Sequence, residues 1–137
     1  MMEGDIEGVL AIDRKITGKS RAFTYVSSPN NYISGELAMS VVAEAEGRIV
    51  GFLLGTMVES SYKGADIALA QSIGVDPAYF HQRIGTRLMQ GFIECCKKHG
   101  IDSVHAMVRS QDGKMISFLR SMDFVDGELV ELVKLLE

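Results

Sequence analysis

The sequence predicts an α/β fold in which one mixed sheet is flanked by helices. Three observations lead to this prediction. The chain opens with a helical stripe of apolar residues, β-rich runs follow in its middle, and an apolar strand ending at Asp76-Pro77 is succeeded by an amphipathic helix. Along the whole chain the expected order is helix, hairpin, strand, helix, strand, helix and closing strand.

The first helix is expected to begin at Asp5, whose carboxylate can accept hydrogen bonds from the first helical N–H groups, and to end near Gly18. Residues 19–36 mix Ser, Asn, Pro and Gly with aromatic side chains, which predicts a short helix within a mobile connection. The stripe of the first helix consists of Ile6, Val9, Leu10, Ile12, Asp13 and Ile16.

A hairpin is expected next, because residues 37–46 and 48–58 are rich in β-forming side chains and meet at Glu46-Gly47, where Gly can supply a positive φ. Residues 65–75 then form a third strand. The mostly apolar composition of this strand predicts a central place in the sheet.

The second half of the chain alternates helix and strand. A helix is expected from Ile84 to the basic turn before Gly100, with Ile84, Leu88 and Phe92 on one face. Residues 103–109 alternate and predict a strand, Asp112 caps a further helix, and residues 129–136 form the closing strand.

At 137 residues the chain has the length of one domain, and we expect a single domain over residues 1–137. Its hydrophobic content is 47% and its charged content 23%, which is typical of a globular protein. No apolar run approaches the roughly 20 residues that span a bilayer, so no membrane association is expected. A net charge of −4 and a pI near 5.4 argue against general nucleic-acid binding.

Cys95 and Cys96 are the only cysteines, and in a helix adjacent side chains point about 100° apart, which places them poorly for a disulfide. They are expected to be free thiols in a reducing compartment, which predicts a cytoplasmic protein. His99 is the only further ligand nearby, so no metal site is expected.

The step from strand to helix at residues 73–89 is the most informative stretch for function. The first N–H groups of a helix have no partner within the helix, and the helix dipole is positive there, so this end can hold a phosphate. Gly85 has no Cβ and lets a ligand approach the backbone closely. Many α/β domains with this pattern bind nothing there, and the spacing alone leaves both interpretations open.

A more specific signal lies in the same stretch. The run Ile73-Gly74-Val75-Asp76-Pro77, followed by Tyr79 and Gly85, resembles motif A of the GCN5-related N-acetyltransferases (GNATs). The element order is similar to that family from the first helix onward. The resemblance covers about the whole chain and implies a mixed, mostly antiparallel sheet.

In that family a loop with the pattern Q/R-x-x-G-x-G/A binds the diphosphate of acetyl-coenzyme A. The loop corresponds here to residues 80–85, with Phe80 in place of Gln or Arg and Arg83 in place of the first Gly. The Arg83 guanidinium could contact a phosphate oxygen, or its side chain could obstruct the approach that Gly permits.

The resemblance implies an N-acetyltransferase that transfers the acetyl group of acetyl-coenzyme A to a primary amine of a small molecule or a protein. The parallel strands at residues 65–75 and 103–109 would separate to admit the pantetheine arm of the coenzyme. The residues that the resemblance places at the coenzyme are Ile73, Gly74, Val75, His81, Gln82, Arg83, Ile84, Gly85 and Thr86.

The resemblance does not assign the acid and the base of the reaction. The helix tyrosine of many relatives corresponds to Leu119 and the strand glutamate of some relatives to Met107, and neither side chain titrates. These departures also fit a second interpretation, a catalytically weak or inactive GNAT-like module that binds acyl-coenzyme A. A third interpretation is an α/β domain without a coenzyme. The weak catalytic candidates, each of which also has an ordinary structural interpretation, are Glu59, Tyr62, Asp66, Tyr79 and His105.

Members of this family usually begin with one more strand before the first helix, and here almost no chain precedes that helix. The opening edge strand is therefore expected to be missing. Its absence would leave unpaired backbone groups on the neighbouring strand at residues 37–46, and on this ground we expect a homodimer.

Overall fold

The computed structural model describes residues 5–17, 39–58, 66–80, 82–128 and 130–137. The chain forms two compact units, Met1–Met107 and Val108–Glu137. The first unit carries the sheet and the long helices, and the second carries one helix and the C-terminal segment. The single domain over residues 1–137 stays a prediction.

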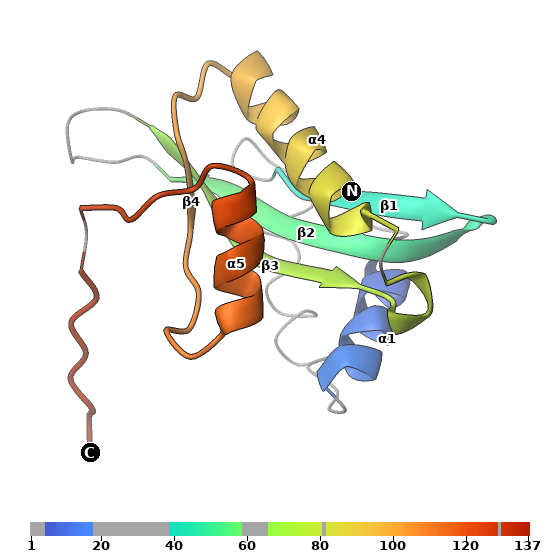
Figure 1. Ribbon diagram of the computed structural model, residues 1–137, viewed down its shortest axis with the longest axis horizontal. Coiled ribbons are helices and arrows are strands. Elements are labelled where there is room, and N and C mark those ends of the chain that lie inside the picture. Colours follow the sequence, from blue (N-terminus) through green and yellow to red (C-terminus); the bar gives the residue numbers. More distant parts are fainter. Residues whose placement is uncertain (1–4, 18–38, 59–65, 81, 129) are drawn as a thin grey trace. The chain divides into compact units, whose positions relative to one another are not determined.

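Among its described residues, the first unit forms a sheet of four strands in the order β1-β2-β3-β4 (Figure 1). These strands are β1 (Val41–Ala45), β2 (Arg48–Val58), β3 (Ile67–Val75) and β4 (Val104–Ala106). The first two pairings are antiparallel and the third is parallel, so the predicted mixed sheet is confirmed.

The predicted hairpin is confirmed as well. Glu46 and Gly47 connect β1 to β2 with φ angles of 55° and 77°, the left-handed conformation that a two-residue hairpin turn requires. The third strand has neighbours on both sides, as its apolar composition predicted.

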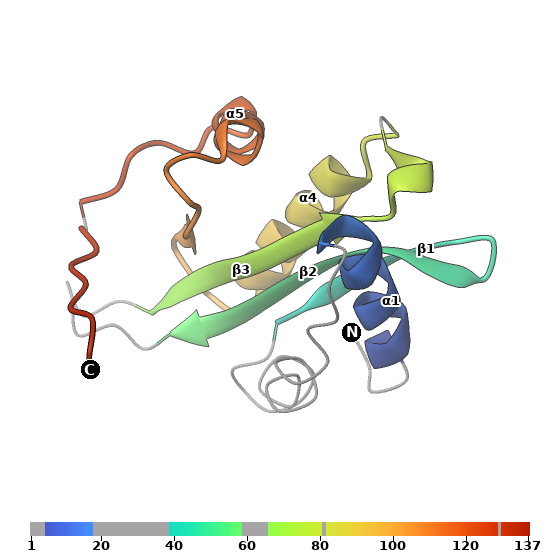
Figure 2. The same cartoon turned by 90° about the horizontal axis from the view of Figure 1, so that it is seen from below.

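Helices cover both faces of this sheet (Figure 2). α1 (Ile6–Thr17) packs on one face, where Val9 and Ile12 form a buried cluster with Phe52 and Leu54 of β2. α4 (Ile84–Lys98) packs on the opposite face, and its buried side chains are Leu88, Met89, Phe92 and Cys96. Both helices begin and end within a residue or two of their predicted bounds, and Gly100 follows α4 with a φ of 72°.

The alternation of side chains along β2 decides which residues meet which helix. Phe52 and Leu54 point toward α1, whereas Gly51 and Gly55 lie under α4. A Cβ atom on Gly55 would lie 2.6 Å from Cζ of Phe92, so the missing side chain creates the space in which this ring is buried. The close packing of α4 on the sheet therefore depends on glycine in the strand.

The two cysteines are free thiols, as predicted. Burial of Cys96 in the interface between α4 and the sheet raises the pKa of its thiol to about 11, so this group is protonated at neutral pH. Among the described residues no three His, Cys, Asp or Glu side chains gather in a way that could hold a metal ion. None of the described helices is both long and apolar enough to cross a membrane.

The second unit contains α5 (Gly113–Ser121), which is capped as predicted because the Asp112 carboxylate accepts a hydrogen bond from Met115 N at 3.1 Å. A short turn follows, and Asp126 after it forms an ion pair of 2.8 Å with Arg120 of α5. The remaining chain is extended to Glu137.

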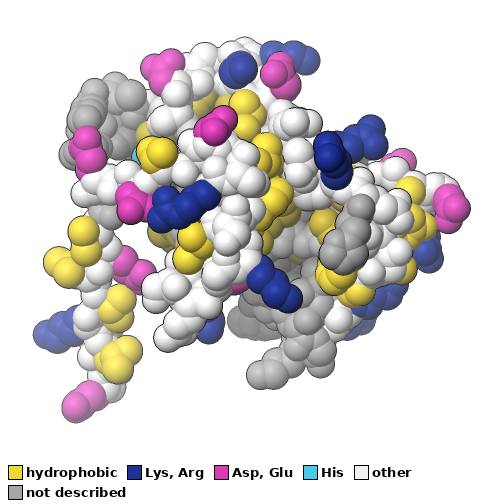
Figure 3. All heavy atoms as spheres, in the orientation of Figure 1, with side chains coloured by type: hydrophobic (Ala, Val, Ile, Leu, Met, Phe, Trp, Pro, Cys, Tyr) yellow, Lys and Arg dark blue, Asp and Glu magenta, His cyan; other side chains and the backbone are white. Residues whose placement is uncertain are grey.

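Two strand predictions for the C-terminal part of the sequence, from residue 103 onward, are wrong. The strand predicted over residues 103–109 is only Val104–Ala106, because its pairing with β3 stops at Ala106. The closing strand predicted over residues 129–136 is absent from the described residues 130–137. Apolar side chains recur there without strict alternation and no described strand pairs with them, so they lie exposed along the C-terminal segment (Figure 3).

Two glycine substitutions are expected to have opposite effects. Gly55→Ala should lower the free energy of unfolding by about 1–3 kcal/mol, because the new methyl group overlaps the Phe92 ring. Gly91→Ala on α4 should raise it by roughly 0.5–1 kcal/mol, because open space surrounds that position and alanine favours the helix. Urea unfolding of both variants measures the difference, and equal effects would contradict the packing described for β2.

Candidate functional site

The C-terminal half of β3 has an open side. β4 pairs with β3 at Ala68, Leu69 and Ala70, and none of its described residues pairs with Ile73, Gly74 or Val75. Figure 1 shows β3 continuing past the point where this pairing stops. On its other side, β3 pairs with β2 along its whole length.

The backbone of this segment presents hydrogen-bonding groups on the open side. Asp76 N donates to Val50 O at 2.8 Å, so the backbone N–H group of Asp76 faces β2. Because these groups alternate in direction along a strand, those of Val75 and Ile73 face away from β2, and those of Gly74 face toward it. Two residues of the predicted set therefore offer main-chain donors and acceptors on the open side.

The turn after β3 is organised by the carboxylate of Asp76, which is 4% exposed. Its Oδ1 accepts a hydrogen bond from Ala78 N at 3.0 Å, and its Oδ2 accepts one from Lys15 Nζ at 2.8 Å. Lys15 and the Ala78 amide lower the pKa of Asp76 from its ordinary value, and the charge of Arg48 adds to this effect. The chain then forms a single 3₁₀ turn, Pro77–Tyr79.

Tyr79 attaches the same turn to the β1–β2 hairpin. Its hydroxyl donates a hydrogen bond to Oε2 of Glu46 at 3.0 Å and accepts one from Nη2 of Arg48 at 3.3 Å. The Arg48 guanidinium also lies 5.5 Å from the centre of the Tyr79 ring, a cation–π distance. The turn is thus held by α1 at one end and by the hairpin at the other.

The N-terminus of α4 follows this turn. Its first internal hydrogen bond runs from Arg87 N to Arg83 O, so the N–H groups of Ile84, Gly85 and Thr86 precede the helical ladder. No residue in the described part of the chain accepts a hydrogen bond from them. These amides lie at the helix N-terminus to which the sequence analysis assigned a phosphate, and that assignment stays a prediction.

Arg83 adopts a left-handed conformation, with φ 61° and ψ 23°, immediately before α4. This conformation raises the free energy of a residue with a Cβ by roughly 1–2 kcal/mol, whereas glycine adopts it without this penalty. The structure therefore gives a physical reason for the glycine that the GNAT loop has at this position. Gln82 and Arg83 are exposed beside the helix start, and His81 lies outside the described residues.

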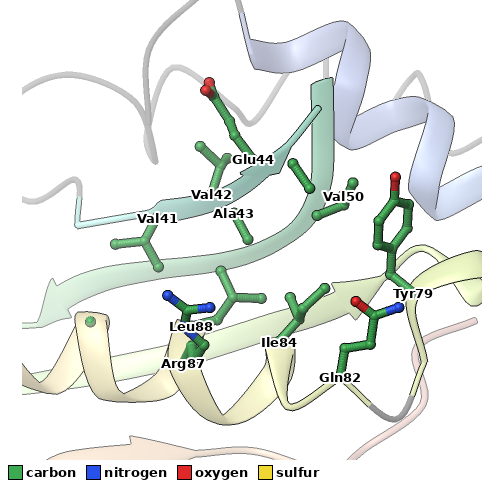
Figure 4. Close-up of a pocket in the computed structure, with 12 residues that line it drawn as sticks. Val41, Val42, Ala43, Glu44, Val50, Tyr79, Gln82, Ile84, Arg87 and Leu88 are labelled. Atoms are coloured by element: carbon green, nitrogen blue, oxygen red, sulfur yellow. The ribbon is translucent and has the colours of Figure 1, made fainter. Parts of the chain in front are cut away.

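A hollow of about 480 Å³ lies between β1 and α4. Figure 4 shows Val41 and Ala43 of β1 across from Ile84 and Leu88 of α4, with Gln82 and Tyr79 at the end near the helix N-terminus. Because β2 and β3 separate β1 from β4, this hollow is distinct from the open side of β3.

The catalytic candidates are distributed as follows. Glu59 and Tyr62 lie outside the described residues, and Asp66 is exposed just before β3. Tyr79 is engaged with the hairpin, on the side of β3 away from β4. His105 pairs with Leu69, one position before the end of the β3–β4 pairing, and its Nε2 lies 3.1 Å from Ser103 Oγ.

Sequence reasoning missed the residues that hold the turn. Lys15 and Asp76 are 61 positions apart, and Tyr79 is 33 positions from Glu46. Lys15 lies near the end of α1 and Arg48 at the start of β2. Charged side chains are common at such places, where they usually face solvent. No local pattern in the sequence could have paired them with the turn.

The comparisons with known proteins agree with this geometry. A model of the acetyltransferase (GNAT) family matches residues 9–124, and the chain belongs to this family. It is an acyltransferase, and acetyl-coenzyme A is its co-substrate. No curated protein matches the sequence.

Solved structures share the fold at low sequence identity. Aminoglycoside N-acetyltransferase AAC(6')-Iy in complex with CoA is similar with a TM-score of 0.84 and 12% identity, over 98% of this chain and 90% of that chain. Aminoglycoside acetyltransferase meta-AAC0020, from an uncultured soil metagenomic sample and in complex with sisomicin, has a TM-score of 0.77 and 19% identity, over 100% and 93%. The ribosomal-protein-S18-alanine N-acetyltransferase from Escherichia coli has a TM-score of 0.77 and 20% identity, over 93% and 76%.

The stability of the protein is expected to depend on Asp76 at low pH. The pKa of Asp76 is lowered in the folded protein from an ordinary value of 3.8, so its ionised form stabilises the fold above that pH. This contribution is lost as the pH falls through the lower pKa of the folded state. Asp76→Asn should remove this part of the pH dependence, and denaturant unfolding at a series of pH values measures it. Identical pH profiles for the variant and the wild type would contradict the role assigned to the carboxylate.

Proposed function

We propose that this protein transfers the acetyl group of acetyl-coenzyme A to a primary amine of a small molecule or a protein. One observation carries the proposal. The open side of β3 leads through a fixed turn directly into helix amides that have no acceptor in the described part of the chain. A ligand with an amide-containing arm and a diphosphate matches both halves of this surface.

The arm of the coenzyme is assigned to β3. Ile73 and Val75 offer their N–H and C=O groups on the open side, where pantetheine amides can pair with them as a further strand does. Gly74 directs its own polar groups toward β2 and joins the two contacting residues. Ala70 and Ala106 mark the end of the β3–β4 pairing, and the thioester is assigned to that end.

The diphosphate is assigned to the start of α4. The amides of Ile84, Gly85 and Thr86 can donate to its oxygens, and the helix dipole favours the negative charge. Gln82 and Arg83 supply further donors at the exposed edge of this site, and His81 belongs to the same loop in sequence.

The transfer needs little from the protein once the reactants are in place. The nitrogen of a neutral amine attacks the thioester carbonyl carbon, a C–N bond forms, and the C–S bond breaks with its electron pair on sulfur. A backbone N–H of β3 can stabilise the developing oxyanion. Water can accept the ammonium proton, and the thiolate leaves without a strong acid.

The neighbours guide the choice of acceptor. Two of them are aminoglycoside acetyltransferases and a third is a ribosomal-protein-S18-alanine N-acetyltransferase, which supports small amines and protein amines as the two classes of acceptor. A second candidate function is a catalytically weak acyltransferase that mainly binds acyl-coenzyme A. Leu119 and Met107, which carry no titratable group, favour this alternative.

Binding and turnover separate these functions. At a coenzyme concentration 100 times its dissociation constant, acetyl-coenzyme A should stabilise the protein by about 2.7 kcal/mol in a thermal unfolding experiment. Thiol release is then measured with polyamines, aminoglycosides, amino acids and N-terminal peptides. No stabilisation would overturn the coenzyme site, and stabilisation with only slow thiol release for every amine would support the catalytically weak alternative.

Gly85→Val is expected to weaken coenzyme binding while leaving the fold intact. A branched side chain in the first turn of α4 would project into the space assigned to the diphosphate. The expected loss of affinity is about tenfold or more, measured by calorimetry with acetyl-coenzyme A. Gly91→Val, on the same helix beside open space, is the matched control and should leave affinity unchanged. Equal affinities for the two variants would place the diphosphate elsewhere.

A further inference from the structure

Residues of other elements hold the turn between β3 and α4 in place. α1 supplies Lys15 to Asp76, and the β1–β2 hairpin supplies Glu46 and Arg48 to Tyr79. We infer that Lys15 is a positioning residue for coenzyme binding, which fixes the start of the diphosphate loop through its ion pair with Asp76. This inference rests on the proposed function and names a residue on the far face of the sheet that determines the affinity of the site.

Every polar atom of Asp76 takes part in fixing the turn. Its N–H donates to Val50 O at 2.8 Å, and its C=O accepts a hydrogen bond from Tyr79 N at 2.8 Å. Its side chain holds Ala78 N through one oxygen and Lys15 Nζ through the other. The backbone conformation of the turn therefore depends on the rotamer of Asp76, and Lys15 is the side chain that holds this rotamer.

Lys15 acts from the side opposite the helix that presents the amides. Side chains alternate along β3, so Val75, which is paired with Gly51, faces α4, and Asp76 faces α1. Lys15 lies in the last turn of α1, and its Nζ forms an ion pair with Asp76 Oδ2 at 2.8 Å. Its effect on a diphosphate at the N-terminus of α4 is transmitted through the turn.

The side-chain exposures agree with this role. The Lys15 side chain is 52% exposed, whereas that of Asp76 is 5% exposed. A surface ion pair would contribute little to stability, but a buried carboxylate that loses its cation must be solvated or protonated, and its rotamer is then released. A loop that must be ordered when ligand binds has lower affinity than one already held in the binding conformation.

The experiment measures coenzyme A binding by calorimetry, at a temperature well below the unfolding midpoint of every variant. Lys15→Met removes the ammonium and keeps a long unbranched side chain, and it should raise the dissociation constant about tenfold. Lys15→Arg should restore most of the affinity. Arg14→Met is the matched control, because it removes the same charge from the same helical turn without contacting Asp76, and it should change affinity by less than about twofold.

Asp76→Asn separates positioning from a direct electrostatic effect. Removal of a negative charge near the site would strengthen binding of the diphosphate if charge alone mattered. Positioning through the turn predicts the opposite, a weakening similar to that of Lys15→Met. The double variant should bind no more weakly than the weaker single variant, because both changes break one interaction.

Three outcomes overturn the inference. Affinity of Lys15→Met equal to that of the wild type would overturn it and leave the proposed function intact. Tighter binding by Asp76→Asn would show that charge, and not loop position, connects this pair to the site. Failure of the wild-type protein to bind coenzyme A would overturn the proposed function and this inference together, so the two failures are distinguishable.

Discussion

The buried carboxylate of Asp76 is the constraint on which the rest of the site depends. It lies at the point where the sheet ends and the chain turns toward α4. The carboxylate accepts hydrogen bonds from α1 and from the 3₁₀ turn, and the backbone N–H of the same residue donates one to β2. A carboxylate is suited to this place because it can accept from a backbone amide and a cation at the same time. Proline at the next position prevents the strand from continuing and fixes the start of the turn.

The two parts of the candidate coenzyme site, the open side of β3 and the start of α4, lie on either side of Asp76 in the sequence. Toward the N-terminus, β3 leaves one side of its backbone open because β4 is short. Toward the C-terminus, α4 presents amides that precede its hydrogen-bonded ladder. The packing of α4 over Gly51 and Gly55 fixes the helix on the sheet, and the turn fixes its first residues. Local backbone geometry and tertiary packing thus act on the same few residues.

Much of the fold could be predicted, because the spacing of apolar residues along a helix or strand indicates which of its faces is buried. The stripe of α1, the runs of β1 and β2 and the cap of α5 at Asp112 were all found from residue type and spacing. The closing strand over residues 129–136 was wrong, because an apolar run records hydrophobicity and does not record whether a partner strand exists. Similarly, β4 is shorter than its alternating sequence indicated, because its pairing with β3 ends at Ala106 although β3 itself continues to Val75.

The sequence by itself determined the family, the order of the elements as far as α5 and the strand-to-helix step with Gly85, because each of these depends on residues that are close together in the chain. Only the tertiary structure decided that Lys15 meets Asp76, that Tyr79 meets Glu46, and that Ile73 and Val75 have open backbone groups. Such contacts join residues far apart along the chain. They depend on how α1, the hairpin and β3 pack together, and no local pattern of residues encodes that packing.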